Sequence, residues 1–106
     1  MQNYKNLKVW EKAHEFTLKV YEGTKIFPKE EIYSLTNQMR RAASSVPANI
    51  AEGCGKNSKL ESAHFLNIAL GSASESEYFL ILSKDLIYLK EETYVILYNL
   101  INEIKS

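Results

Sequence analysis

QMRRAASSVPANIAEGCG, residues 38–55, is the segment from which the architecture of this chain can be inferred. It joins two adjacent arginines to a run of small residues and places a proline inside a helical pattern. A proline in a helix interior removes a hydrogen bond and clashes with the preceding turn, at a cost of about 3 kcal/mol. We therefore expect a helix that is bent or interrupted at Pro47. Buried amides and carboxylates need partners, so Gln38, Asn49 and Glu52 among apolar neighbours predict a polar network.

A chain of 106 residues, 45% of them hydrophobic, is long enough to bury one core, and we expect a single domain over residues 1–106. Its 13 basic and 13 acidic residues balance to a formal net charge of zero. This balance argues against a protein held to nucleic acid by bulk positive charge. Cys54 is the single cysteine, which excludes an intramolecular disulfide and fits the reducing cytoplasm. The sequence has no signal-peptide core and no run of about 18 apolar residues, so we expect no membrane contact.

Helical periodicity runs through the chain, and strand alternation is almost absent. The pattern predicts four helices, over residues 7–25, 29 or 30 to 52, 57 or 58 to about 89, and 91 or 92 to 104. Pro28 separates the first two helices, because the residue before a proline disfavours helix and proline suits a first turn. Three short connections then give an all-α fold, an antiparallel up-down-up-down four-helix bundle with its second helix bent at Pro47.

Glycines and caps mark the ends of the predicted second and third helices. Gly53 and Gly55 suit the left-handed conformation of a C-cap. Ser58, with Glu61 three residues later, forms a capping box. In the middle of the third helix, Gly71 lies in a run of small residues that lets another helix approach closely.

The first helix carries an apolar arc of roughly 200°, wider than the ~100° stripe of a helix with one contact face. One part of the arc holds Val9, Ala13, Phe16 and Val20, and the other holds Leu7, Trp10, Leu18 and Tyr21. We expect this helix to contact more than one neighbour. Several aromatic side chains could stack nucleobases, but at helical spacing we favour an oligomer interface. They are Tyr78, Phe79, Tyr88, Tyr94 and Tyr98.

Few residues offer catalytic or metal chemistry. His14 and His64 belong to no HxxxH, HExxH or ExxH pair, and Cys54 forms no CxxC, so the sequence predicts no metal site. Residues 53–58 lack the GxxxxGK[ST] spacing of a phosphate loop, and we expect no cofactor. Four carboxylates could serve acid–base catalysis in principle: Glu52, Glu61, Glu75 and Glu77. No His, Cys or Ser is evidently placed with them, so we favour salt bridges and caps and expect no enzyme.

Arg40 and Arg41 allow two interpretations. A guanidinium suits phosphate oxygens, which would make a nucleic-acid contact. In that case the lysines of the first helix would contribute as well: Lys5, Lys8, Lys12 and Lys19. The alternative is pairing with Glu52, Glu75 or Glu77, within the chain or across a subunit interface. Adjacent residues point about 100° apart on a helix, so one arginine can be paired while the other faces outward. We favour the structural role, because zero net charge does not support phosphate binding.

Several motifs together resemble a known family. QMRRAASSVPANIAEG, residues 38–53, is preceded by FPKEEIYSLTN and followed by FLNIALGSASESE, residues 65–77. With YKNLKVWEKA near the start and KDLIYL later, they resemble the bacterial four-helix-bundle family whose founding members are encoded by intervening sequences in large-subunit ribosomal RNA genes. The motif positions are Gln38, Arg40, Arg41, Pro47, Asn49, Glu52, Gly53, Gly71, Ser72 and Glu75.

The resemblance implies an antiparallel bundle that assembles into a ring-like homopentamer, with no established enzymatic activity. A related protein is the accessory protein of diversity-generating retroelements, a basic pentameric barrel that binds nucleic acid and a reverse transcriptase. The present chain lacks that basic character. Our leading hypothesis is therefore a non-enzymatic homo-oligomer, a scaffold or accessory in an RNA- or retroelement-related process. Direct RNA or DNA binding through the arginines and first-helix lysines is the alternative.

Overall fold

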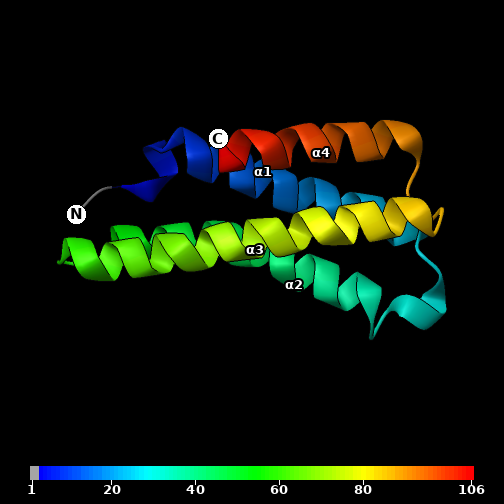
Figure 1. Ribbon diagram of the computed structural model, residues 1–106, viewed down its shortest axis with the longest axis horizontal. Helices are drawn as coiled ribbons and strands as arrows, with labels where there is room; N and C mark the ends of the chain where they lie inside the picture. The colour runs from blue at the N-terminus through cyan, green and yellow to red at the C-terminus, as the bar shows by residue number, and fades with distance from the viewer. Residues whose placement is uncertain (1–2) are drawn as a thin grey trace.

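The structure is a computed structural model that describes residues 3–106, and it shows a bundle of four long helices (Figure 1). These are α1 (Lys8–Gly23), α2 (Leu35–Cys54), α3 (Lys59–Asp85) and α4 (Glu91–Lys105). Short 3-10 helices occupy the start of the chain and the connection between α1 and α2: η1 (Tyr4–Asn6), η2 (Thr24–Ile26) and η3 (Lys29–Glu31). No strand occurs within residues 3–106, so the predicted all-α four-helix fold is confirmed.

Each helix packs against two others. α1 contacts α2 and α4, α3 contacts the same two helices, and the most extensive contact is that between α2 and α3. α1 and α3 therefore lie at opposite corners of the bundle. One core joins all four helices through fully buried side chains such as Phe16, Met39, Leu80, Leu97 and Ile101. Burying each of these contributes about 1.5–3 kcal/mol, which makes the shared core the main source of stability.

The second helix begins later than predicted, at Leu35 instead of residue 29 or 30. Phe27 is extended before Pro28, as expected, but Lys29–Glu31 forms only a 3-10 turn. Glu31 accepts a hydrogen bond from the Tyr88 hydroxyl at 2.9 Å, which ties this turn to the connection between α3 and α4. The same hydrogen bond, with burial and the negative charges of Glu31 and Glu30, raises the pKa of Tyr88 above its usual value of 10.0.

α2 continues without interruption through Pro47. Proline has no N–H, so the carbonyl of Ala43, four residues earlier, loses its helical donor. The hydroxyl of Thr17 on α1 lies 3.1 Å from that carbonyl and 2.8 Å from the Ala13 carbonyl of its own helix. A hydrogen bond between helices can therefore replace the one that the proline removes. A bend at Pro47, like the up-down-up-down order of the helices, stays a prediction.

The glycines play other parts than predicted. Gly55 is the C-cap of α2, as predicted, but its φ of −86° and ψ of −3° are right-handed, so the left-handed conformation expected at Gly53 and Gly55 is wrong. A Cβ on Gly53 would lie 3.1 Å from the Ser62 carbonyl oxygen, so this glycine permits the close approach of α2 to α3. A Cβ on Gly71 would meet nothing within 4 Å. Gly71 therefore does not admit a neighbouring helix within the chain.

The ends of α3 differ in how well the sequence predicted them. Ser58 is the N-cap and accepts a hydrogen bond from the Glu61 N–H at 3.1 Å, which confirms the predicted cap. The helix ends at Asp85, earlier than predicted, because Ile87 adopts a left-handed φ of 64°. The N–H groups of Ile87 and Tyr88 donate to Lys84 and Ser83, both at 2.9 Å, in the pattern that closes a helix C-terminus. Isoleucine gave no sequence signal for this turn, since glycine is the usual residue there.

Candidate functional site

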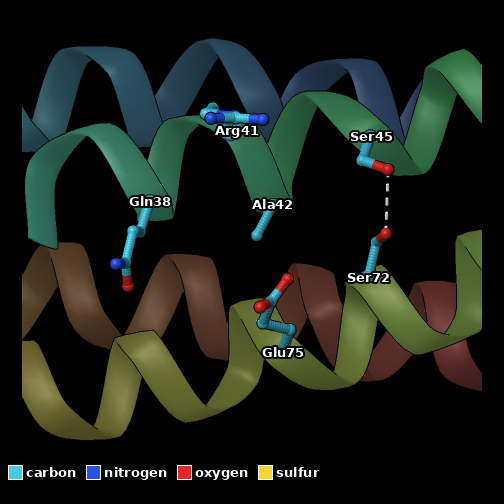
Figure 2. A pocket seen from close by; sticks show the side chains of 6 residues that line it. All are labelled: Gln38, Arg41, Ala42, Ser45, Ser72 and Glu75. Atoms are coloured by element: carbon cyan, nitrogen blue, oxygen red, sulfur yellow. Dashed lines mark hydrogen bonds between the residues drawn. The ribbon is translucent and has the colours of Figure 1, made fainter. Parts of the chain in front are cut away.

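A polar cavity of about 320 Å³ lies in the groove between α2 and α3. Figure 2 shows Gln38 pointing from α2 toward α3, and Glu75 pointing back from α3 toward α2. The residues that line the cavity are Gln38, Arg41, Ala42 and Ser45 of α2 and Ser72 and Glu75 of α3. Four of these six were singled out from the sequence. They come from two helices and are brought together only by the packing of α2 on α3.

Ser45 joins the two walls of the cavity. Its hydroxyl oxygen accepts hydrogen bonds from the Ser72 hydroxyl at 2.8 Å and from the Asn49 amide at 2.9 Å (Figure 2 shows the first). Asn49 also donates to the Ser45 carbonyl at 2.8 Å, so its amide is fixed against its own helix. Sequence reasoning missed Ser45. Its position one turn after Arg41 and one turn before Asn49 was the available signal, since residues four apart share a helix face.

Three lining side chains have no hydrogen-bond or ion-pair partner among residues 3–106: Gln38, Arg41 and Glu75. Arg41 and Glu75 are both exposed, and their charges are opposite. The predicted pairing of an arginine with Glu52, Glu75 or Glu77 is not formed within the described chain. Glu52 is 3.5 Å from Lys56, and Glu77 is 2.8 Å from Lys105.

Arg40 points to a different place from Arg41, as the 100° step of a helix requires. Its Nε donates to the Thr24 hydroxyl at 2.8 Å, and Nη2 donates to the Tyr21 carbonyl at 3.4 Å. The guanidinium also lies 4.9 Å from the centre of the Tyr21 ring. A positive charge near the C-terminal end of α1 is favourable for the helix dipole. Arg40 therefore holds α1 to α2.

The remaining motif positions lie outside the cavity. Pro47 and Gly53 are buried on α2, and Gly71 is exposed on α3. Of the first-helix lysines, Lys12 is 3.2 Å from Glu103 of α4, whereas Arg41 lines the groove between α2 and α3.

Apolar side chains are exposed on several elements, including Val95 and Ile96 of α4, and two sets of them lie on the opposite helices α1 and α3. On α1, Leu18 is 58% exposed and Tyr21 43%; we call this pair the α1 surface. On α3, Leu70, Tyr78 and Ile81 are 48%, 57% and 40% exposed; we call these three the α3 surface. Since α1 and α3 occupy opposite corners, the two surfaces differ in both position and composition. Of the other aromatic residues, Phe79 is buried, and Tyr88 and Tyr94 pack partly buried against the core.

Both histidines of the chain contact aromatic side chains. His14 stacks on Trp10 with ring centres 5.0 Å apart, and His64 meets the Phe65 ring edge to face. Cys54 is half-buried near the end of α2. Within residues 3–106, no group of three or more His, Cys, Asp or Glu side chains is placed to hold a metal ion. None of the helices in this range is long and apolar enough to span a membrane.

The arrangement is that of a small four-helix-bundle protein with a polar groove between two of its helices. A family model described as "23S rRNA-intervening sequence protein" matches residues 5–106. The chain therefore belongs to the 23S rRNA-intervening sequence protein family. It is also similar to a solved structure of a protein of unknown function from the S23 ribosomal protein family of Bacteroides thetaiotaomicron VPI-5482. The two chains are 32% identical, the match covers 92% of this chain and 88% of the other, and the TM-score is 0.83. A comparison with curated proteins gives no match.

Proposed function

We propose that the protein acts through self-assembly, as a non-enzymatic homo-oligomer that serves as scaffold or accessory in an RNA-related process. The observation that carries this proposal is the double-faced character of α3. Buried Ala69, Ala73 and Leu80 cover the side toward the core, while the α3 surface leaves further apolar side chains on the outside. Exposed apolar side chains that gather on one face of a helix mark an interaction surface.

The positions of the exposed surfaces favour a ring over a two-fold dimer. A two-fold interface uses the same patch on both subunits, whereas two different patches that pair head to tail generate a ring when the rotation closes. The α1 and α3 surfaces are two different patches on opposite corners of one bundle. We propose that the α1 surface of one subunit packs against the α3 surface of the next, and that five subunits close the ring.

The RNA-related part of the proposal is supported by the family, whose description refers to the 23S ribosomal RNA intervening sequence. We place the protein in the cytoplasm, where its single cysteine is stable as a thiol. The link to retroelements and to a reverse transcriptase stays a prediction.

Native mass spectrometry with matched surface variants tests the assembly. We expect the unmodified protein at five times the 12.2 kDa mass of one chain, and Leu18→Glu or Tyr78→Glu as monomers. Each variant keeps one surface intact, so an equal mixture of the two should give a heterodimer and no larger species. Tyr33→Glu, at a site that is 93% exposed outside both surfaces, is the matched control and should leave the oligomer intact. An unmodified protein that is monomeric at micromolar concentration would show the proposal to be wrong.

Direct RNA binding is the second candidate, and the free guanidinium of Arg41 is the observation that favours it. Fluorescence anisotropy with a labelled single-stranded RNA at about 50 mM salt gives the most sensitive test, because phosphate contacts are strongest at low salt. Binding through Arg41 predicts weaker affinity for Arg41→Gln and a shallower dependence on salt. Glu92→Gln, on the exposed face of α4, provides the control variant. Absence of binding under these conditions would exclude this candidate.

A further inference from the structure

The cavity between α2 and α3 has opposite charges on its two walls, and these charges determine which class of ligand it suits. Arg41 supplies the positive charge from α2, and Glu75 the negative charge from α3. Neither is within 4.0 Å of an oppositely charged side chain among residues 3–106. Glu75 is three residues before Tyr78 of the α3 surface, but the inference concerns a small ligand and not a second subunit, so it goes beyond the proposed assembly.

The α2 wall presents hydrogen-bond donors. The guanidinium of Arg41 has five N–H donors and no acceptor. The Ser45 hydroxyl, which is hydrogen-bonded to Ser72 and Asn49, lies on the same wall. Arg41 and Ser45 are one helical turn apart and share a face, with the Gln38 amide one turn before Arg41. Such a wall suits a carboxylate or another anionic oxygen group.

The α3 wall presents acceptors. The carboxylate of Glu75 only accepts hydrogen bonds. The Ser72 hydroxyl is hydrogen-bonded to Ser45, and its oxygen can accept a further hydrogen bond from the cavity. Ser72 and Glu75 are three residues apart and lie on one face of α3. This wall suits a protonated amine.

We propose that the cavity binds a small zwitterion of the amino-acid class, with its carboxylate toward α2 and its ammonium group toward α3. Glu75 favours a ligand with a positive charge, and Arg41 favours one with a negative charge, so a ligand with both charges suits both walls. A volume of about 320 Å³ is near the lower end of the range for ligand pockets, so the ligand is small. Because both charged side chains are exposed, each ion pair contributes only modestly and binding is in the millimolar range.

Titration of the isotope-labelled protein, followed by its backbone amide NMR signals, tests the proposal. The probes are glycine and γ-aminobutyrate, two zwitterions with different charge separations. Acetate and methylammonium each carry only one of the two charges. We expect saturable shifts at residues 38–45 and 72–75 with a zwitterion, and at least about tenfold weaker binding of either single-charge probe. The zwitterion that binds more tightly has the charge separation that better matches the distance across the cavity.

Two charge-neutralising variants separate binding from folding. Arg41→Gln and Glu75→Gln should each reduce zwitterion affinity to the level of a single-charge probe, while the unchanged spectrum of the remaining residues shows that the bundle is intact. Glu92→Gln, on the exposed face of α4, should bind as the unmodified protein does. The proposal is overturned if neither zwitterion gives a saturable shift up to about 100 mM, or if acetate binds as tightly as the zwitterions. Full affinity in either cavity variant would overturn it as well.

Discussion

Toward α1, helix α2 finds partners within the chain for its polar groups, whereas toward α3 it leaves several of them facing a cavity. On the first side, Arg40 is bonded to Thr24 and Tyr21, and the carbonyl freed by Pro47 is within reach of Thr17. On the second side, Gln38 points toward α3 and Glu75 points back toward α2, and Arg41 lines the same cavity without a partner among residues 3–106 (Figure 2). Neighbouring residues of one motif therefore have different partners, because each residue along the helix is rotated by 100° and its side chain points to another helix.

The interface between α2 and α3 is in close contact at Gly53 and opens into the cavity near Arg41. Substitutions that test this contrast are expected to have the largest effect on stability. Gly53→Val would drive a branched side chain into the Ser62 carbonyl, since even a Cβ there lies 3.1 Å away. We expect a loss of about 2–3 kcal/mol in the free energy of unfolding, measured in urea. Gly71→Val, which has no atom within 4 Å of its Cβ position, should stay within about 0.5 kcal/mol in the monomer. Equal losses for the two variants would contradict the close approach at Gly53.

Thr17→Val tests the hydrogen bond between α1 and α2 near Pro47. The variant keeps the shape of the side chain but leaves the Ala43 carbonyl without its donor, and we expect a loss of about 2 kcal/mol. In a Pro47→Ala background the backbone N–H at position 47 restores the helical hydrogen bond. The same Thr17→Val change should then cost at least about 1 kcal/mol less. Identical costs in both backgrounds would show that the hydroxyl does not compensate for the proline.

Arg40→Ala and Arg41→Ala compare two adjacent residues of one chemical type. Loss of the hydrogen bonds and ring contact of Arg40 should cost about 1.5 kcal/mol. Loss of the exposed Arg41 side chain should change stability by less than about 0.5 kcal/mol. Thermal unfolding of the two variants side by side measures the difference, and a reversed order would refute the division of roles.

Ser72→Ala should have the smallest effect. It removes one neutral hydrogen bond at the rim of an open cavity, where water can replace the lost partner, and we expect about 0.5 kcal/mol. Urea unfolding of the variant gives the value. A loss above about 2 kcal/mol would mean that the pair of serines is a core element of the α2–α3 contact.

The fold was largely predictable from the sequence because four helices follow from apolar periodicity, and Ser58 with Glu61 gave a reliable start to α3. The errors have local physical causes. α2 starts late because the backbone of Ser34 (φ −126°, ψ −109°) is not helical, and the turn before it is held by the hydrogen bond of Glu31 to Tyr88, 57 positions further along the chain. α3 stops early because Ile87 adopts a conformation that its side chain does not favour. Neither cause is visible in a window of neighbouring residues.

The residues of the candidate site were largely predictable from the sequence, but the position of the site in the fold was not. The polar motif suggested Gln38, Arg41, Ser72 and Glu75, and all four line one cavity. Ser45 was missed because a serine in a run of small residues gives no signal of its own. Whether Arg40 or Arg41 would be the paired residue could not be decided, since helix phase fixes the angle between them but not the direction of the neighbouring helices.

The sequence by itself determined that residues 38–55 form part of a helix in an all-α bundle and that two adjacent arginines must point in different directions. These are consequences of local periodicity and covalent geometry. The tertiary structure alone decided that Thr17 would be placed to satisfy the carbonyl of Ala43, that Arg40 would join α1, and that Arg41 and Glu75 would line one cavity. These contacts join residues that are far apart in the chain, and only the packing of whole helices brings them within a few ångströms.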